Sequence, residues 1–188
     1  MNVFVLSTGR CGSTTFERAC RHITNYSSGH ETRVDRLGPD RLDYPSRHIE
    51  SDNRLSWFLG RMERRYPREV FYVHLQRDPR AVARSYARRL DPGLIMSAYA
   101  HGIYLYLPED LENQAHEVAL DYVQTVTANI ELFLAGKPNK MQFRLENAKQ
   151  DFRKFWDRIG AEGDLEAALA EFDVAYNAES GPYPPSGG

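Results

Sequence analysis

Residues 3–15 have the sequence VFVLSTGRCGSTT, and the organisation of the whole chain can be worked out from them. Four consecutive β-forming residues, Val3 to Leu6, are bounded by Ser, Thr and Gly, which is typical of a short buried strand in a parallel sheet. From Phe16 to Ile23 apolar residues recur at helical spacing, and Thr14-x-x-Glu17 has the form of a capping box. The pattern predicts a strand, a glycine-containing loop and a helix.

The loop between this strand and helix has the composition of an anion site. Gly9 and Gly12 can adopt positive φ and let backbone N–H groups converge at a helix N-terminus, and Arg10 adds a positive charge. The Walker A pattern does not fit, because Gly12 follows Gly9 by only three residues and no Lys comes after it. Taken alone, the stretch also fits an ordinary glycine-rich turn without a ligand.

A second strand-to-helix junction lies further along the chain. Residues 70–76, VFYVHLQ, predict a strong strand, and the following Asp78 and Pro79 suit the N-cap and first position of a helix. Arg77 would then lie at the carboxyl end of a central strand. Ser85 would lie about two turns into the helix, on a face that can look back at Arg77. A guanidinium and a hydroxyl converging there predict a second anion site.

Together these motifs carry a resemblance to a known family. The loop S-x-G-R-x-G-S-T resembles the 5′-phosphosulfate-binding loop of sulfotransferases that use 3′-phosphoadenosine 5′-phosphosulfate (PAPS), and R-D-P-R-x-x-x-x-S is similar to the 3′-phosphate motif of the same family. The match is specific in these two motifs and loose in the closing part, from Arg144-Leu145-Glu146 to Asn177. The residues that it places at the donor are Arg10, Cys11, Gly12, Ser13, Thr14, Thr15, Arg77 and Ser85.

The resemblance implies an activity and roles for several residues. It implies a P-loop kinase-like fold and in-line transfer of a sulfuryl group from PAPS to a hydroxyl or amine of a carbohydrate or small-molecule acceptor, leaving adenosine 3′,5′-bisphosphate (PAP). Arg10 would stabilise the leaving phosphate, so no metal is required. By analogy with carbohydrate-acting relatives the general base is Glu31 first and His30 second, while His48, Glu50 and Asp52 lie nearby. An ATP-dependent P-loop kinase and a non-catalytic nucleotide-binding module remain as alternatives.

Length and composition limit the number of domains, the kinds of binding partner and the cellular compartment that we expect. The 188 residues fit one domain, 1–180, and the Gly- and Pro-rich stretch 181–188 predicts a disordered tail. A net charge of −2 gives no general attraction to nucleic acid. The sequence contains neither a secretory signal pattern nor an apolar run of the roughly 18 residues that a membrane span needs, so we expect a cytoplasmic protein with two free thiols. Cys11 is a candidate nucleophile, but a small loop-filling residue is the better interpretation.

The remaining segments alternate between strand and helix patterns. We expect a long functional loop over 25–45, a short strand over 46–50, a helix from Asp52 or Asn53 to Pro67, an end to the Ser85 helix at 91–93, a helix over 109–135, a strand over 141–146, and helices over 148–159 and 164–172. Tyr99, His101, Tyr104 and Tyr106 could form a stacking wall for a ligand, although core packing is commoner. His74 should be a core histidine. The alternation predicts a three-layer α/β fold with a central parallel sheet, and a small acceptor pocket completed by a second subunit is an open possibility.

Overall fold

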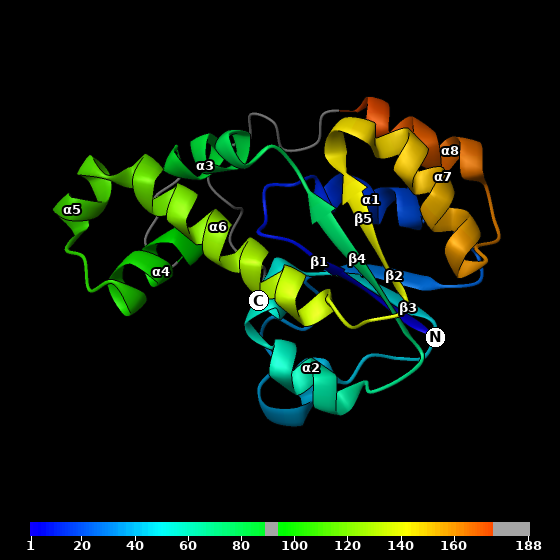
Figure 1. The fold of residues 1–188 in the computed structure, drawn as a ribbon. Coiled ribbons are helices and arrows are strands. Elements are labelled where there is room, and N and C mark those ends of the chain that lie inside the picture. The colour runs from blue at the N-terminus through cyan, green and yellow to red at the C-terminus, as the bar shows by residue number, and fades with distance from the viewer. Residues whose placement is uncertain (89–93, 175–188) are drawn as a thin grey trace.

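The protein, seen here as a computed structural model that describes residues 1–88 and 94–174, has a central sheet of five parallel strands. The strand order is β2-β3-β1-β4-β5, with helices on both faces (Figure 1). The strands are β1 (Asn2–Leu6), β2 (Ser27–His30), β3 (His48–Ser51), β4 (Val70–Gln76) and β5 (Lys140–Arg144). The expected α/β fold with a parallel sheet is therefore confirmed. The expected tail, the helix end at 91–93 and Asn177 lie outside the described residues.

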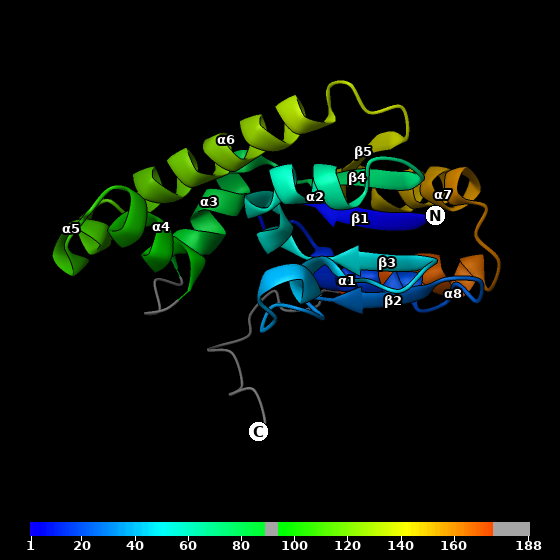
Figure 2. The ribbon, with the colours of Figure 1, turned by 90° about the horizontal axis from the view of Figure 1, so that it is seen from below.

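The helices divide between the two faces of the sheet and the region beyond its carboxyl edge. They are α1 (Ser13–Cys20), α2 (Leu59–Arg65), α3 (Pro79–Ala87), α4 (Ile95–Ile103), α5 (Pro108–Asn113), α6 (Ala115–Leu134), α7 (Ala148–Ile159) and α8 (Leu165–Ala170). Figure 2 shows α3 to α6 extending past the carboxyl ends of the strands. None of the helices in the described ranges is long and apolar enough to cross a membrane.

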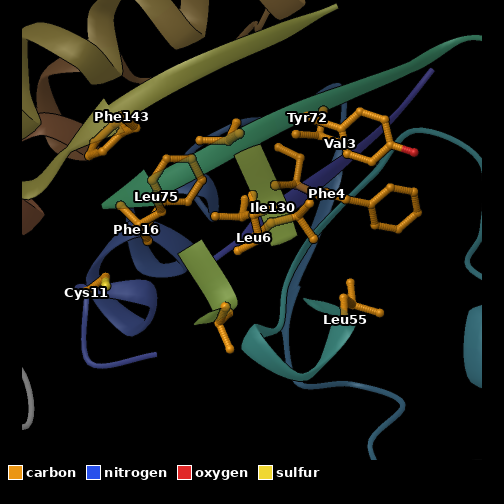
Figure 3. Close-up of a cluster of buried hydrophobic side chains, with 14 of the residues drawn as sticks. Val3, Phe4, Leu6, Cys11, Phe16, Leu55, Tyr72, Leu75, Ile130 and Phe143 are labelled. Carbon is orange, nitrogen blue, oxygen red and sulfur yellow. The ribbon is translucent and has the colours of Figure 1, made fainter. Parts of the chain in front are cut away.

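Aromatic side chains fill both layers of the core. On the side of α1 and α7, the ring of Phe16 lies 5.0 Å from that of Phe143 and 5.1 Å from that of Phe155. On the side of α6, the Tyr72 ring meets the Phe133 ring edge-on at 5.3 Å. The side chains in Figure 3 come from strands, from α1 and α6, and from the segment after β3, so one core joins the whole fold.

Several sequence-based boundaries are confirmed. The strand over 70–76 is β4, and the Asp78 carboxylate caps α3 by accepting a hydrogen bond of 2.7 Å from the backbone N–H of Ala81. The helix over 148–159 is α7, which ends at Gly160 with φ 62°. Apolar runs bounded by Pro, Gly and capping residues are strong local signals, so these elements were predictable.

Part of the segment expected to be a loop is a strand. Within 25–45, Ser27–His30 forms the edge strand β2, which pairs with β3 from Ser27 opposite His48 to His30 opposite Ser51. The sequence Ser-Ser-Gly-His has no apolar alternation, so no strand signal is present. β2 is held by its backbone pairing with β3 and by the buried polar side chains of β3, and not by burial of apolar side chains of its own.

Three expected helices have different boundaries. The predicted capping box of Thr14 and Glu17 is wrong, because α1 begins at Ser13 and its N-cap is Gly12, which makes no side-chain hydrogen bond. The Glu17 side chain is instead buried, and its carboxylate pairs with Arg21 at 2.8 Å. The helix expected over 109–135 is broken at Gln114 into α5 and α6. The helix expected after Asp52 is a 3₁₀ turn, Asn53–Trp57, followed by α2.

Candidate anion-binding site

The two predicted anion motifs follow neighbouring strands. β1 and β4 pair in parallel with Leu6 opposite His74, so the segments that follow these strands leave the same edge of the sheet. From β1 the chain turns through α1 towards β2 and β3, whereas from β4 it turns towards β5. The connections diverge, and this is the switch point at which ligands bind in open α/β sheets.

The loop after β1 has the backbone of an anion cradle. Three residues have positive φ: Gly9 at 82°, Arg10 at 57° and Gly12 at 87°. Side chains at the two glycines would clash, since a Cβ on Gly9 would lie 2.2 Å from the Tyr86 hydroxyl and one on Gly12 would lie 2.7 Å from Leu145 Cδ1. Left-handed turns of this kind direct successive N–H groups into one concavity at the start of α1.

Hydrogen bonds from α3, from α6 and from the turn after β3 fix the position of this loop. The hydroxyls of Tyr86, from α3, and Tyr122, from α6, both donate to the backbone carbonyl of Thr8, at 2.7 and 3.0 Å. The Ser56 hydroxyl donates to the carbonyl of Ser7 at 3.1 Å. A cradle held in this way needs little rearrangement when an anion binds.

Arg10, Arg77 and Ser85 lie together beside the loop. Arg10 Nε donates a hydrogen bond of 3.0 Å to Ser85 Oγ, and an Arg77 guanidinium nitrogen donates to the Arg10 carbonyl at 3.3 Å. Arg77 is exposed, whereas Arg10 and Ser85 are half-buried. The two motifs therefore form one site with two cations. The sequence pattern placed Ser85 opposite Arg77, and the contact from Arg10 was not anticipated.

The first turn of α1 supplies the remaining predicted donor residues. Ser13 and Thr14 are partly exposed, so their hydroxyls as well as their backbone N–H groups can face a ligand. Thr15 is buried at 9% exposure, which leaves its backbone N–H, one of the unpaired groups of a helix start, as its contribution.

Cys11 occupies the interior of the loop. Its side chain is 2% exposed, and its Sγ lies 3.3 Å from Thr8 Oγ1 and donates to the Gly9 carbonyl at 3.2 Å. Burial raises the pKa of the thiol to about 11, so it stays protonated and is a poor nucleophile. These contacts agree with the interpretation as a loop-filling residue, and only its backbone can serve a ligand.

The two candidate bases have different surroundings. His30, the last residue of β2, places Nε2 3.0 Å from Ser13 Oγ, and so contacts the start of α1. Glu31 follows in a left-handed conformation, φ 55°, and its carboxylate pairs with Arg54 at 2.8 Å. The structure thus brings His30 against the cradle, while the carboxylate of Glu31 points to the segment after β3.

A buried polar network supports the turn that carries both residues. The Glu50 carboxylate, fully buried, accepts hydrogen bonds from the backbone N–H and hydroxyl of Thr32 at 2.8 and 2.7 Å and lies 2.9 Å from His48 Nε2. Asp52 is equally buried and pairs with Arg41. The side chains of His48, Glu50 and Asp52 therefore have structural partners. The sequence signal of this network is their spacing of two residues along β3 and just beyond its end.

A cavity of about 520 Å³ adjoins the site on the side of β5. Its wall includes Arg77, Cys11 and Glu146, together with His74 and Gln76 of β4. Glu146 also accepts a hydrogen bond of 2.9 Å from the backbone N–H of Asp78. Within the described ranges no group of three His, Cys, Asp or Glu side chains has the arrangement of a metal site.

His74 should make the protein sensitive to acid. Burial lowers the pKa of its imidazole to about 4, against 6.5 in the unfolded chain, so the unfolded state binds the proton first. Stability is therefore complete above pH 6.5 and falls as the pH drops towards 4, by about 3 kcal/mol from this residue. Urea unfolding of wild type and His74→Gln should show this extra loss only in wild type. Parallel pH profiles for the two proteins would contradict the assignment.

Comparison of the sequence with protein-family models and with curated proteins gives no match.

Proposed function

We propose that the chain is a sulfotransferase that moves the sulfuryl group of PAPS to a hydroxyl or amine of a carbohydrate or small-molecule acceptor. The observation that supports this most is the contact between the two motifs. Arg10 bonds to Ser85 and Arg77 to the Arg10 carbonyl, so cations and hydroxyls suited to two separate phosphates converge at one switch point. A donor with a 5′-phosphosulfate and a 3′-phosphate matches that arrangement.

The 5′ end of the donor fits the loop after β1. Backbone N–H groups from Gly12 to Thr15, at the start of α1, can bind an anion there, and Arg10 supplies positive charge. When bound, the donor supplies the sulfuryl group and a leaving phosphate. Preorganised hydrogen-bond donors at the point where charge develops contribute about 3 kcal/mol each to transition-state stabilisation. We assign this role to the loop and to Arg10, with no metal.

The 3′-phosphate fits Arg77 and Ser85. Arg77 is exposed at the end of β4, where its guanidinium can bind a phosphate with two parallel hydrogen bonds. These residues take no part in the chemistry; they distinguish PAP and PAPS from ATP and AMP, which have no 3′-phosphate.

For the general base we favour His30 over Glu31. A base has to lie within hydrogen-bond reach of the acceptor, and the acceptor has to approach the cradle. The imidazole of His30 already contacts Ser13 there, whereas the Glu31 carboxylate is paired with Arg54. Glu31, with Arg54, is then placed to orient the acceptor. Both cysteines are buried and unpaired, which fits a reducing compartment such as the cytoplasm.

Titration calorimetry with PAP, AMP and ATP tests the proposal. We expect PAP to bind about 100-fold more tightly than AMP, because only PAP engages Arg77 and Ser85 through a charge-assisted pair. ATP should bind more weakly than PAP. Tighter binding of ATP would favour a P-loop kinase, and tight PAP binding without turnover on any acceptor would favour a non-catalytic nucleotide-binding module.

A further inference from the structure

One face of the sheet is left uncovered at β5. Met141 and Phe143 point into the core, whereas Gln142 and Arg144, which alternate with them, are exposed. Parallel sheets are normally covered on both faces. Here α6 packs on β4 through the Phe133 and Tyr72 rings, and its C-terminal end lies close to β4 and β5 in both views (Figures 1 and 2), but β5 keeps an open polar face.

The open face continues onto β4. His74 lies opposite Gln142 in the strand register, and Gln76 lies opposite Arg144. These four side chains alternate along their strands in the same phase, so they share one face of the sheet. Together these four side chains form a polar surface, here called the floor, on the face of the sheet that α6 borders.

Two adjoining cavities lie on this floor. One, of about 520 Å³, includes His74, Gln76 and Thr127 in its lining, and the other, of about 660 Å³, includes His74 and Gln142; Glu131 of α6 lines both. Each has the size of a small-molecule site, which is typically about 300–1,000 Å³. Shared residues make the two cavities parts of one groove between α6 and β5.

One polar atom at the bottom of the groove lacks a partner within the described part of the chain. Gln76 Oε1 is buried without a hydrogen bond, and the His74 imidazole, two positions before it on the same strand face, is 3% exposed. A buried polar group left unpaired costs about 1–3 kcal/mol, so such groups are uncommon without a ligand or water to meet them. An unpaired amide oxygen beside a buried imidazole that lines both cavities indicates a built site.

The chemistry of these groups favours a neutral ligand rich in hydroxyls. A neutral imidazole offers one donor and one acceptor, the Gln76 carbonyl oxygen needs a donor, and Thr127 can do either. A hydroxyl group satisfies all three. The carboxylate of Glu131 can accept from two hydroxyls and repels an anion, and aliphatic side chains such as Val123 offer contact to the carbon skeleton.

Most cations near the groove are already engaged, which is a further reason to exclude an anionic ligand. Lys154 pairs with Asp151 at 2.9 Å, and Arg158 donates to the Lys140 carbonyl at 2.7 Å. Lys140 itself donates to the carbonyl of Ala135 at 2.8 Å, near the end of α6. These contacts use three of the positive charges for structure. Arg77 and Arg144 remain at the end of the groove next to the cradle, where Glu146 also lines the wall.

We propose that this groove is a second binding site, separate from the phosphate cradle, and that it takes a neutral sugar. It lies towards β5 and α6, whereas His30 approaches the cradle from β2, at the opposite edge of the sheet. The proposal does not depend on sulfuryl transfer, because it follows from the two cavities, the buried imidazole of His74 and the unpaired Gln76 Oε1. Arg77 and Cys11 line both regions, so a bound sugar lies next to the donor site.

Saturation-transfer NMR with the methyl glycosides of glucose, galactose and mannose tests the site, using the full chain with and without saturating PAP. We expect at least one glycoside to bind in both conditions. Protein-observed titrations then give its affinity for wild type, His74→Phe, Glu131→Ala and, as a matched control, His116→Phe, a substitution on α6 away from the groove. His74→Phe should bind about tenfold more weakly, as expected for loss of a buried hydrogen-bonding group. Glu131→Ala, which removes an exposed carboxylate, should also bind more weakly but by a smaller factor, and the control should bind as wild type does.

Three results would overturn the proposal. They are the failure of all three glycosides to bind, displacement of the glycoside by PAP, and equal affinity in wild type, His74→Phe and Glu131→Ala. Glu131 is exposed, so its variant should fold even if His74→Phe does not. PAP binding is measured separately, so failure of the sugar site and failure of the sulfotransferase proposal would be told apart.

Discussion

Replacing His30 by alanine should lower kcat for sulfuryl transfer by about 10²- to 10⁴-fold, the usual contribution of a positioned general base. The imidazole lies 3.0 Å from Ser13 Oγ at the start of α1, which in the proposed reaction is where the sulfuryl group would pass to the acceptor. Affinity for PAP should stay at the wild-type value, because the base does not hold the donor. Initial rates at saturating PAPS, with calorimetry of PAP binding on the same samples, measure both quantities.

Glu31→Gln is the matched comparison for this experiment. It keeps the size of the side chain and removes the charge that pairs with Arg54 at 2.8 Å. We expect about a tenfold change in KM for the acceptor and a smaller change in kcat, as for loss of a partly exposed ion pair that orients a ligand. Should Glu31→Gln lose kcat by 10²-fold while His30→Ala keeps it, the base would be Glu31.

Arg77→Ala should weaken PAP binding by about 100-fold, the value of a charge-assisted pair with phosphate. AMP should bind the variant and the wild type about equally, since it has no 3′-phosphate. At saturating PAPS the variant should keep most of its kcat, because the 3′-phosphate is remote from the breaking bond.

The control for Arg77→Ala is Arg80→Ala, which removes another exposed guanidinium three positions along. It should leave PAP affinity unchanged and so separate a specific contact from a general loss of positive charge. An equal loss of affinity for PAP and AMP in Arg77→Ala would mean that the second motif does not hold the 3′-phosphate.

Much of the candidate anion-binding site could be predicted from the sequence because its signals are local. The strands β1 and β4 are apolar runs, each followed at once by the residues that make its motif, and the parallel sheet places the two ends together. The contact between Arg10 and Ser85 spans 75 positions and depends on the direction of one flexible side chain, so no sequence pattern encodes it.

The surroundings of the candidate base were harder to predict. β2 has no apolar alternation, and its existence depends on pairing with β3 and on Glu50 holding Thr32. Without that strand, His30 and Glu31 were neighbouring residues of one loop, and the resemblance ranked Glu31 first as the base. The strand separates them, because His30 ends it and Glu31 begins the turn.

An all-parallel sheet also affects how the chain is made. Parallel partners cannot be joined by a tight hairpin, so each strand waits for one that is distant in the sequence. β1 leaves the ribosome first but lies at the centre of the sheet, between β3 and β4, and the edge strand β5 pairs with β4 only after α3 to α6 have been synthesised. A nascent chain therefore leaves the edges of β1 unpaired until β3 and then β4, which ends at Gln76, have been made, a state in which aggregation competes with folding. Slow folding is the expected consequence of building the candidate anion-binding site at the middle of such a sheet.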